Sequence, residues 1–148
     1  MNNSMELRIS ALSQNEGFAR GAVAGFCLHL NPTLDELTDI KTAVSEAVTN
    51  SIVHAYPKEK GDISIKVNLV DNLIQIEIRD YGTGIKDLQK ARAPFFTTKP
   101  MEERSGMGFT VMESFMDSLD VENAKTGGLI VKMSKEIKQA NSNVRQLG

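Results

Sequence analysis

The end of one predicted strand carries an acidic residue that could bind a ligand. In IQIEIRDYGTGI, residues 74–85, isoleucines alternate with polar residues, which is the period of a strand with one buried face. Asp80 is the next position in the buried phase, so the alternation predicts a carboxylate that faces inward. A buried carboxylate is costly unless a donor binds it, and the sequence places no cationic residue in phase nearby. An exocyclic amine of a nucleotide base would serve as that donor.

Two glycines, Gly82 and Gly84, follow this acid. Because neither carries a Cβ atom, the backbone there can approach a flat ring closely. The alternative is a structural role in which Asp80 caps the turn after the strand, as acids at strand ends often do. The inward phase of Asp80 favours the ligand.

A second group of polar residues lies within TAVSEAVTNSIVHAY, residues 42–56. Positions spaced four apart would bring a hydroxyl, a carboxylate, an amide and an imidazole onto one face of a helix: Thr42, Glu46, Asn50 and His54. A solvated polar face is the ordinary alternative. Asn50 argues against that alternative, because asparagine is a poor residue for the middle of a helix and its neighbours here are apolar.

A Gly-Met-Gly sequence, Gly106, Met107 and Gly108, separates an irregular segment from the next helical pattern. Backbone N–H groups at a helix N-terminus bind phosphate, and glycine before the helix leaves them accessible. A simple hinge between loop and helix is the alternative. The segment is neither a Walker P-loop nor a Rossmann fingerprint, because the chain lacks GxxxxGK[ST] and this stretch lacks the third glycine of GxGxxG.

The elements that would position these residues follow from the same patterns. Residues 13–16 form a capping-box sequence that predicts a helix to about Leu30, and residues 33–36 form another that predicts a helix to about Ala55. Alternation and helical spacing predict the remaining elements: strands near 5–9, 63–69, 74–80, 119–121 and 129–133, and a helix over 109–116. We therefore expect an α+β fold, a two-layer α/β sandwich whose mixed, mostly antiparallel sheet is covered on one face by helices.

Length and composition predict one globular domain, residues 1–148, with an irregular segment at about 86–105 that is typical of a mobile lid. The net charge is −2 without a dense basic tract, so we expect no direct contact with nucleic acid. A single cysteine, Cys27, excludes an intrachain disulfide and fits a reducing compartment. The N-terminus is not typical of a secretory signal, and no apolar run approaches the ~20 residues of a membrane helix. These features predict a cytoplasmic location.

The three groups of residues, in this order along the chain, resemble the Bergerat ATP-binding superfamily of gyrase-type ATPases, Hsp90 chaperones, MutL and histidine kinases. The stretches EAVTNSIVHAY, IRDYGTGI, APFFTTKP and ERSGMGF resemble the bacterial anti-sigma factor serine kinases. The members of that family that act in sporulation match best, and those of the stress response are the alternative. The resemblance covers nearly the whole chain.

The resemblance implies that ATP and ADP bind together with Mg²⁺, which Asn50 would hold against the phosphates. It implies that Glu46 is the general base for an attacking serine hydroxyl. Asp80 would read adenine, and Gly82 and Gly84 would line the base. The other expected nucleotide contacts come from the helix, the lid and the helix after it: His54, Thr98, Lys99, Arg104, Gly106, Met107 and Gly108.

The last predicted hairpin departs from many members of the family. A threonine often lies there beside the adenine-reading acid, whereas this strand reads GGLIV and the nearest hydroxyl belongs to Thr126 in the turn. The network around the base would therefore differ, although the role of Asp80 would not.

The resemblance also implies partners. Such kinases bind a sigma factor, phosphorylate a serine of an anti-anti-sigma protein and act as homodimers. Arg20, in an otherwise small and apolar helix sequence, is a candidate contact to these partners. A surface ion pair with Glu16, four residues earlier, is the alternative role for Arg20.

Two other functions are compatible with the sequence. One is a nucleotide-gated module that sequesters a sigma factor without transferring phosphate, and such a module would not need Glu46 as a base. The other is a gyrase-like or chaperone-like ATPase, which the chain length disfavours because such machines use a further transducer domain. The serine kinase uses every group of residues identified above.

Overall fold

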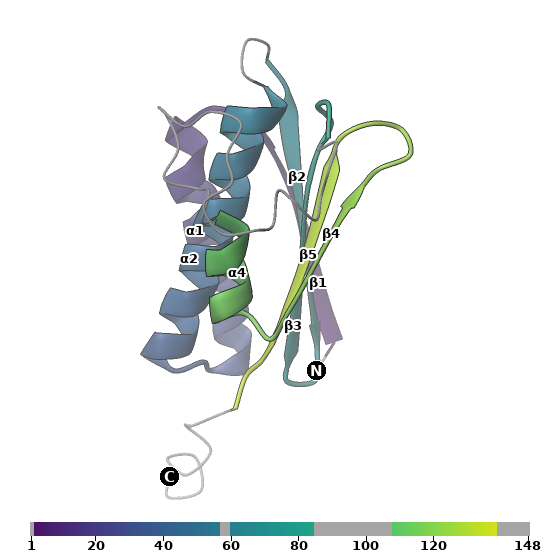
Figure 1. Cartoon of the computed structure of the whole chain (residues 1–148). Helices are drawn as coiled ribbons and strands as arrows, with labels where there is room; N and C mark the ends of the chain where they lie inside the picture. Colours follow the sequence, from purple (N-terminus) through teal and green to yellow (C-terminus); the bar gives the residue numbers. More distant parts are fainter. Residues whose placement is uncertain (1, 57–59, 85–107, 139–148) are drawn as a thin grey trace, which may run out of the picture.

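The computed structural model describes residues 2–56, 60–84 and 108–138, which form one sheet with helices on one side (Figure 1). The strand order is β1-β2-β3-β5-β4, and all four pairings of the described strands are antiparallel. The strands are β1 (Asn2–Ser10), β2 (Asp62–Val70), β3 (Leu73–Asp80), β4 (Ser118–Asn123) and β5 (Leu129–Glu136). The predicted α+β sandwich with a mostly antiparallel sheet is confirmed.

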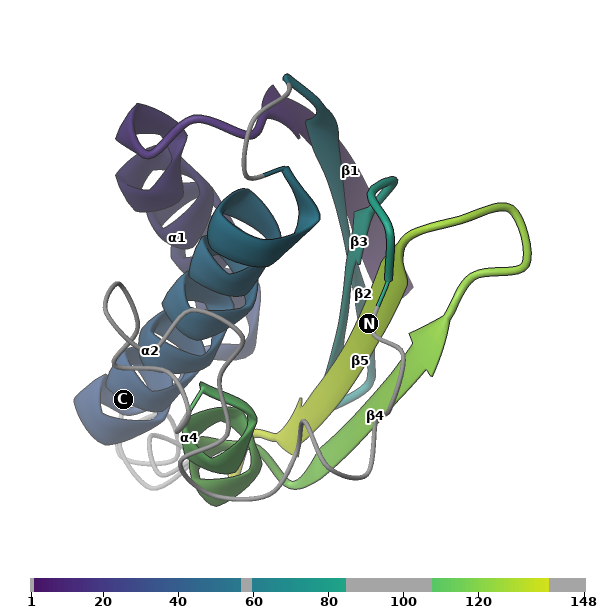
Figure 2. The same ribbon diagram turned by 45° about the horizontal axis from the view of Figure 1, so that its top comes forward.

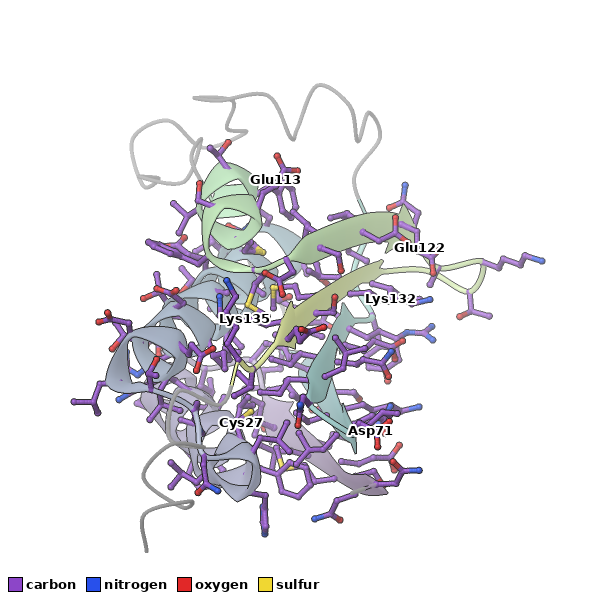
Figure 3. All side chains as sticks on the ribbon, turned by 90° about the horizontal axis from the view of Figure 1, so that it is seen from below. Cys27, Asp71, Glu113, Glu122, Lys132 and Lys135 are labelled. Atoms are coloured by element: carbon purple, nitrogen blue, oxygen red, sulfur yellow. The ribbon has the colours of Figure 1, made fainter. Side chains whose placement is uncertain are left out.

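Three described α-helices, α1 (Gln14–Cys27), α2 (Leu34–Asn50) and α4 (Gly108–Phe115), lie against the same face of the sheet. Helix α2 lies between the other two and contacts both (Figure 2). The apolar positions of β2 and β3 point towards these helices, and their isoleucines are almost completely buried. Figure 3 shows the two faces of the sheet: Cys27 lies between the helices and the sheet, and Lys132 lies on the face away from the helices. No described helix is both long and apolar enough to cross a membrane.

The N-terminus of α2 is fixed by the predicted capping box. Thr33 accepts the N–H of Glu36 at 3.1 Å, and Glu36 accepts the N–H of Thr33 at 2.9 Å. The second carboxylate oxygen of Glu36 also accepts the N–H of Lys138 at 2.9 Å. One side chain therefore anchors both the start of α2 and the segment that follows β5.

The capping box predicted at the start of α1 is wrong. Ser13 stands before the helix, but its side chain makes no capping hydrogen bond. The Glu16 carboxylate instead accepts the hydroxyl of Ser45 at 3.0 Å and pairs with Arg20 at 3.3 Å. Tertiary partners on α2 and on the next turn of α1 thus replace the local contact.

The second predicted helix reaches Ala55, as expected, but it changes type on the way. Helix α2 ends at Asn50, and residues Ser51–Ala55 form a π-helical turn. π-Helical turns widen the backbone and recur at functional sites. This turn lies at the same end of the molecule as the end of β3, since Ser51 and Asp80 are hydrogen-bonded.

Candidate functional site

Asp80, the last residue of β3, is only 3% exposed, so the inward orientation predicted from the alternation is confirmed. Its Oδ1 accepts the N–H groups of Gly82 and Leu129, each at 3.1 Å, and its Oδ2 accepts the hydroxyl of Ser51 at 3.2 Å. Burial raises the pKa of Asp80, while these three hydrogen bonds and the charge of Arg79 act in the opposite direction. The carboxylate is held by partners from three segments of the chain.

These contacts change the interpretation of Asp80 in one respect. The N–H of Gly82 comes from the turn after β3, so Asp80 caps this turn, which is the structural role considered as the alternative. Three donors from the protein therefore bind the Asp80 carboxylate, so its burial does not by itself require a nucleotide base. A carboxylate offers about four acceptor positions, so three donors leave capacity for a further one. Binding of adenine at Asp80 remains a prediction.

The two glycines after Asp80 have neighbours within the protein. A Cβ atom at Gly82 would lie 2.5 Å from the carbonyl oxygen of Ala55, at the end of the π-helical turn. Gly84 has a φ of 76°, and a Cβ atom there would lie 2.5 Å from Oδ1 of Asn123. Close packing of the chain on itself therefore requires both glycines, and their predicted contact with a base is untested.

Glu46 and Asn50 occupy the last turn of α2. Glu46 is 8% exposed, which is unusual for a carboxylate. The side-chain oxygen Oδ1 of Asn50 is buried, and it has no hydrogen-bond partner among the residues that the structure describes. Leaving a buried acceptor unpaired costs about 1–3 kcal/mol, so this oxygen is suited to a ligand. An amide oxygen is a ligand that Mg²⁺ accepts, and Asn50 thus fits the predicted metal ion.

The structure brings Asn50 and Asp80 to the same end of the molecule. Ser51, the neighbour of Asn50 in the chain, supplies the hydroxyl that binds Asp80, and it is itself 5% exposed. No pattern in the sequence indicates this role for Ser51. The predicted polar face consists of every fourth residue, and Ser51 lies one position beyond it.

His54 lies half-buried in the π-helical turn, and Gly108 is the buried first residue of α4, which contacts α2. The remaining predicted nucleotide contacts lie outside the described residues: Thr98, Lys99, Arg104, Gly106 and Met107. The lid predicted at about 86–105 also lies outside them. The described part of the site therefore comprises the end of α2, the π-helical turn, the end of β3 and the start of α4, a region that we call the covered end.

Arg20 lies on α1, which precedes the elements of the candidate site in the sequence. Its guanidinium forms the predicted ion pair with Glu16 at 3.3 Å and donates to the hydroxyl of Ser45 at 3.3 Å. The side chain remains 42% exposed, so a partner could still reach it. The contact between Arg20 and a partner stays a prediction.

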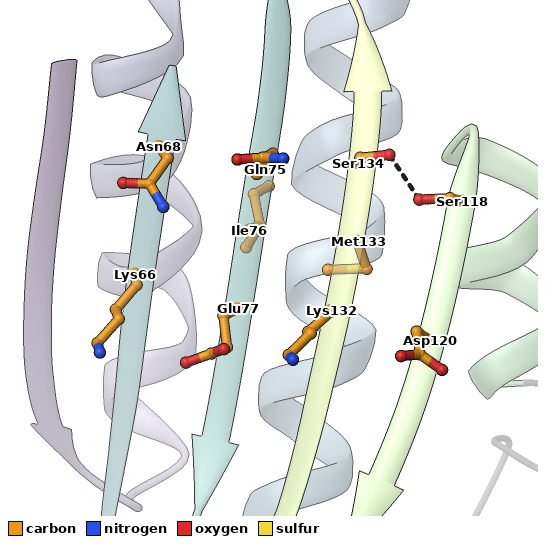
Figure 4. A pocket seen from close by; sticks show the side chains of 10 residues that line it. All are labelled: Lys66, Asn68, Gln75, Ile76, Glu77, Ser118, Asp120, Lys132, Met133 and Ser134. Carbon is orange, nitrogen blue, oxygen red and sulfur yellow. Dashed lines mark hydrogen bonds between the residues drawn. The ribbon is translucent and has the colours of Figure 1, made fainter. Parts of the chain in front are cut away.

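The opposite face of the sheet has a shallow hollow of about 470 Å³, which we call the outer groove (Figure 4). Side chains that alternate in charge meet there in one row across the strands, in the order Glu6, Lys66, Glu77, Lys132 and Asp120. Lys66 pairs with Glu6 of this row at 3.4 Å, and Lys132 pairs with Glu122, outside the row, at 3.2 Å; these side chains are about half exposed or more. None of the residues predicted for the nucleotide site lines this groove. Its charges compensate one another in water, which gives it no marked preference for a ligand.

Comparison with known proteins identifies the family of this domain. Residues 9–135 match a family model described as a histidine kinase-like ATPase domain. The chain is 55% identical over 136 residues to the anti-sigma F factor of Caldanaerobacter subterraneus subsp. tengcongensis, covering 92% of this chain and 95% of that protein. It is 51% identical over 143 residues to the anti-sigma F factor of Bacillus subtilis, covering 96% and 98%.

Solved structures with low sequence identity share the fold. The RsbU and RsbW domains of a Mycobacterium tuberculosis protein superpose with a TM-score of 0.65 at 14% identity, over 91% of this chain and 32% of that longer one. The catalytic domain of the histidine kinase ThkA superposes with a TM-score of 0.57 at 17% identity, over 91% of this chain and 97% of that one. At such identities the similarity concerns the arrangement of helices and strands.

Proposed function

The chain belongs to the family of histidine kinase-like ATPase domains, and we propose from this premise that it is an anti-sigma factor that is also an ATP-dependent protein serine kinase. The names of its relatives, anti-sigma F factors at 51–55% identity over nearly the full length, support the first part. The resemblance of the sequence motifs further implies a sigma factor of sporulation rather than one of the stress response. The kinase activity is supported by the chemistry of the site.

The observation that carries the proposal is the buried Oδ1 of Asn50, which has no hydrogen-bond partner among the described residues and belongs to the residue before Ser51, the partner of the buried Asp80. An unpaired acceptor at the end of α2 and a carboxylate with remaining acceptor capacity suit the two ends of a nucleotide. Asn50 would hold Mg²⁺ and Asp80 would bind the base. Bound Mg²⁺ would neutralise charge on the phosphates and help to orient them.

Within such a site, this chain's own residues would mainly position and polarise the reactants. Glu46, which is buried one helical turn before Asn50, would accept the proton of an incoming serine hydroxyl. Gly108 at the start of α4, together with Gly106 and Met107, would offer backbone N–H groups to the phosphates. Thr98, Lys99 and Arg104 would contribute lid contacts, and His54 would contact the nucleotide or a neighbouring acid.

The proposal includes two protein partners and a second copy of the chain. The sigma factor would be held away from RNA polymerase, and the serine substrate would belong to an anti-anti-sigma protein. Arg20, which is still partly exposed beside Glu16 and Ser45, is the proposed contact for these partners. A function of this kind belongs in the cytoplasm, which agrees with the sequence prediction, and the chain would act there as a homodimer.

Phosphoryl transfer tests the proposal. The wild type and Glu46→Gln are incubated with Mg-ATP and a candidate anti-anti-sigma protein, and binding of nucleotide is measured in both. Glutamine keeps the shape of the side chain but cannot accept the proton, so we expect transfer to serine to fall ~10²–10⁴-fold while nucleotide binding is retained.

The other outcomes would revise the proposal in different ways. ATP-dependent capture of a sigma factor without phosphoryl transfer by either protein would identify a nucleotide-gated binding module. Equal transfer by the two proteins would remove Glu46 from the role of base. Failure of the wild type to bind nucleotide would contradict the proposed function as a whole.

A further inference from the structure

Tyr56, the residue that follows the π-helical turn, joins three segments of the chain through one hydroxyl group. Its oxygen accepts the N–H of Tyr81 at 2.6 Å and donates to the carbonyl oxygen of Asp62 at 2.9 Å. Its ring fills the space beside Gly61, where a Cβ atom would overlap the ring. The hydroxyl therefore ties the segment that continues α2 to the start of β2 and to the residue directly after β3.

Two further contacts connect the same segments. The hydroxyl of Ser51, at the start of the π-helical turn, donates to Asp80 at 3.2 Å. The carbonyl oxygen of Ala55, at the end of that turn, lies so close to Gly82 that a Cβ atom there would be 2.5 Å away. The two ends of the turn thus lie against the end of β3 and the residues directly after it, and Tyr56 adds a hydrogen bond at the far end.

We propose that Tyr56 is a positioning residue that holds the two halves of the nucleotide site, at Asn50 and at Asp80, in one fixed arrangement. This inference rests on the proposed function, because it concerns the same site. A ligand that bridges two prepositioned groups binds more tightly than one that must order them first. Among the described residues Tyr56 is hydrogen-bonded to neither Asn50 nor Asp80, so its effect passes through the backbone of Tyr81 and through the π-helical turn.

Loss of the hydroxyl has a specific consequence. The N–H of Tyr81 and the carbonyl of Asp62 would lose their partner, and the turn could shift relative to β3. A ligand that spans both halves would then pay for restoring their arrangement, whereas a ligand that occupies the base half alone would not. Mg-ADP spans both halves, and adenosine occupies the base half.

The experiment compares these two ligands on the full chain by calorimetry, with Tyr56→Phe beside the wild type. Phenylalanine keeps the ring beside Gly61 and removes only the hydroxyl. We expect Mg-ADP to bind ~10-fold more weakly, about the effect of two lost hydrogen bonds, and adenosine affinity to change less than about twofold. Tyr81→Phe is the matched control, because the Tyr81 hydroxyl bonds to Ser64 at 2.8 Å rather than to the π-helical turn. We expect its affinity for both ligands to equal that of the wild type.

Three results would overturn the inference. These are unchanged Mg-ADP affinity in Tyr56→Phe, an equal loss for Mg-ADP and adenosine, or the same effect in Tyr81→Phe. Absence of Mg-ADP binding by the wild type would contradict the proposed function as well, so the two failures are distinguishable. If Tyr56→Phe did not fold, hydrogen exchange in the wild type without nucleotide would decide. We expect the Tyr81 amide to exchange as slowly as amides in the middle of β3, and rapid exchange would contradict the inference.

Discussion

Polar side chains gather on both faces of the sheet, and their surroundings differ. In the outer groove, side chains of opposite charge alternate across the strands and form exposed ion pairs such as Lys132 with Glu122. At the covered end, Asp80 and Ser51 are almost completely buried, and Oδ1 of Asn50 lacks a partner among the described residues. The outer groove contains more charges, but the covered end contains the polar groups whose burial is costly.

This difference favours the region around Asn50 and Asp80 as the proposed binding site. Exposed ion pairs contribute little, since water and ions screen them, and the loss of one partner leaves the other solvated. A buried acceptor without a donor costs the fold free energy, and such a cost is typical of a position that serves a ligand. Incomplete satisfaction of buried groups therefore identifies the covered end better than the density of charge would.

Substitution of Asn50 by alanine should separate binding from stability most clearly. We expect affinity for Mg-ATP to fall roughly 100-fold, which corresponds to about 2.8 kcal/mol of lost interaction. The free energy of unfolding should rise by about 1 kcal/mol, because alanine removes the unpaired acceptor and is the better helix former. Calorimetry with Mg-ATP and urea unfolding measure the two effects.

Thr49→Ala is the control for this substitution, since it shortens the adjacent polar side chain on α2. It should leave the affinity for Mg-ATP unchanged. A fall in both stability and affinity for Asn50→Ala would mean that the amide has a structural role, and the comparison between the two regions would lose its main support.

The buried carboxylate predicts a dependence on pH. Burial raises the pKa of Asp80 above its ordinary value of 3.8, so between these values the folded state binds more protons than the unfolded state. The contribution of Asp80 to the free energy of unfolding is fully present below a pH of about 3.8, and it is lost as the pH rises through the raised pKa. Affinity for ATP should change in the opposite direction and fall as pH decreases through that pKa, because the ionised carboxylate accepts the hydrogen bond from the base.

Asp80→Asn isolates this contribution from those of other acids. The difference in unfolding free energy between wild type and variant should depend on pH in the window above 3.8, and the variant should bind ATP roughly 100-fold more weakly. Urea unfolding at a series of pH values and calorimetry measure both. Unchanged ATP affinity in the variant would show that Asp80 only caps the turn at Gly82.

The fold was predictable from the sequence because most of its elements depend on local patterns. Alternation placed Asp80 on the buried side, and the capping box at Thr33 depends on residues three apart. The failed capping box at Ser13 shows the limit of this reasoning. Glu16 could have bound locally, but Ser45, 29 residues away, offers it a tertiary partner.

Within the candidate site, the inward orientation of Asp80 was predictable from the sequence, and its hydrogen-bond partners were not. Ser51 binds Asp80 from 29 residues away, and Leu129 does so from 49 residues away. The π-helical turn that brings Ser51 and Tyr56 to β3 depends on the fit between helix and sheet, which periodicity does not describe. Sequence patterns identify which groups face inward, whereas pairing among them is decided by the packing of distant segments.

A substitution in the outer groove should have the smallest effect on stability and on nucleotide affinity. Lys132 is the fourth residue of the alternating row and pairs with Glu122 at 3.2 Å, both side chains being about half exposed. Contact with Glu122, mainly a hydrogen bond, raises the pKa of Lys132, which therefore stays charged at neutral pH.

Lys132→Met keeps the aliphatic part of the side chain and removes the charge. We expect urea unfolding and the affinity for Mg-ATP to remain those of the wild type, since water screens the pair. A loss of nucleotide affinity would mean that the outer face acts on the covered end through the sheet, and the two regions could then no longer be treated as independent.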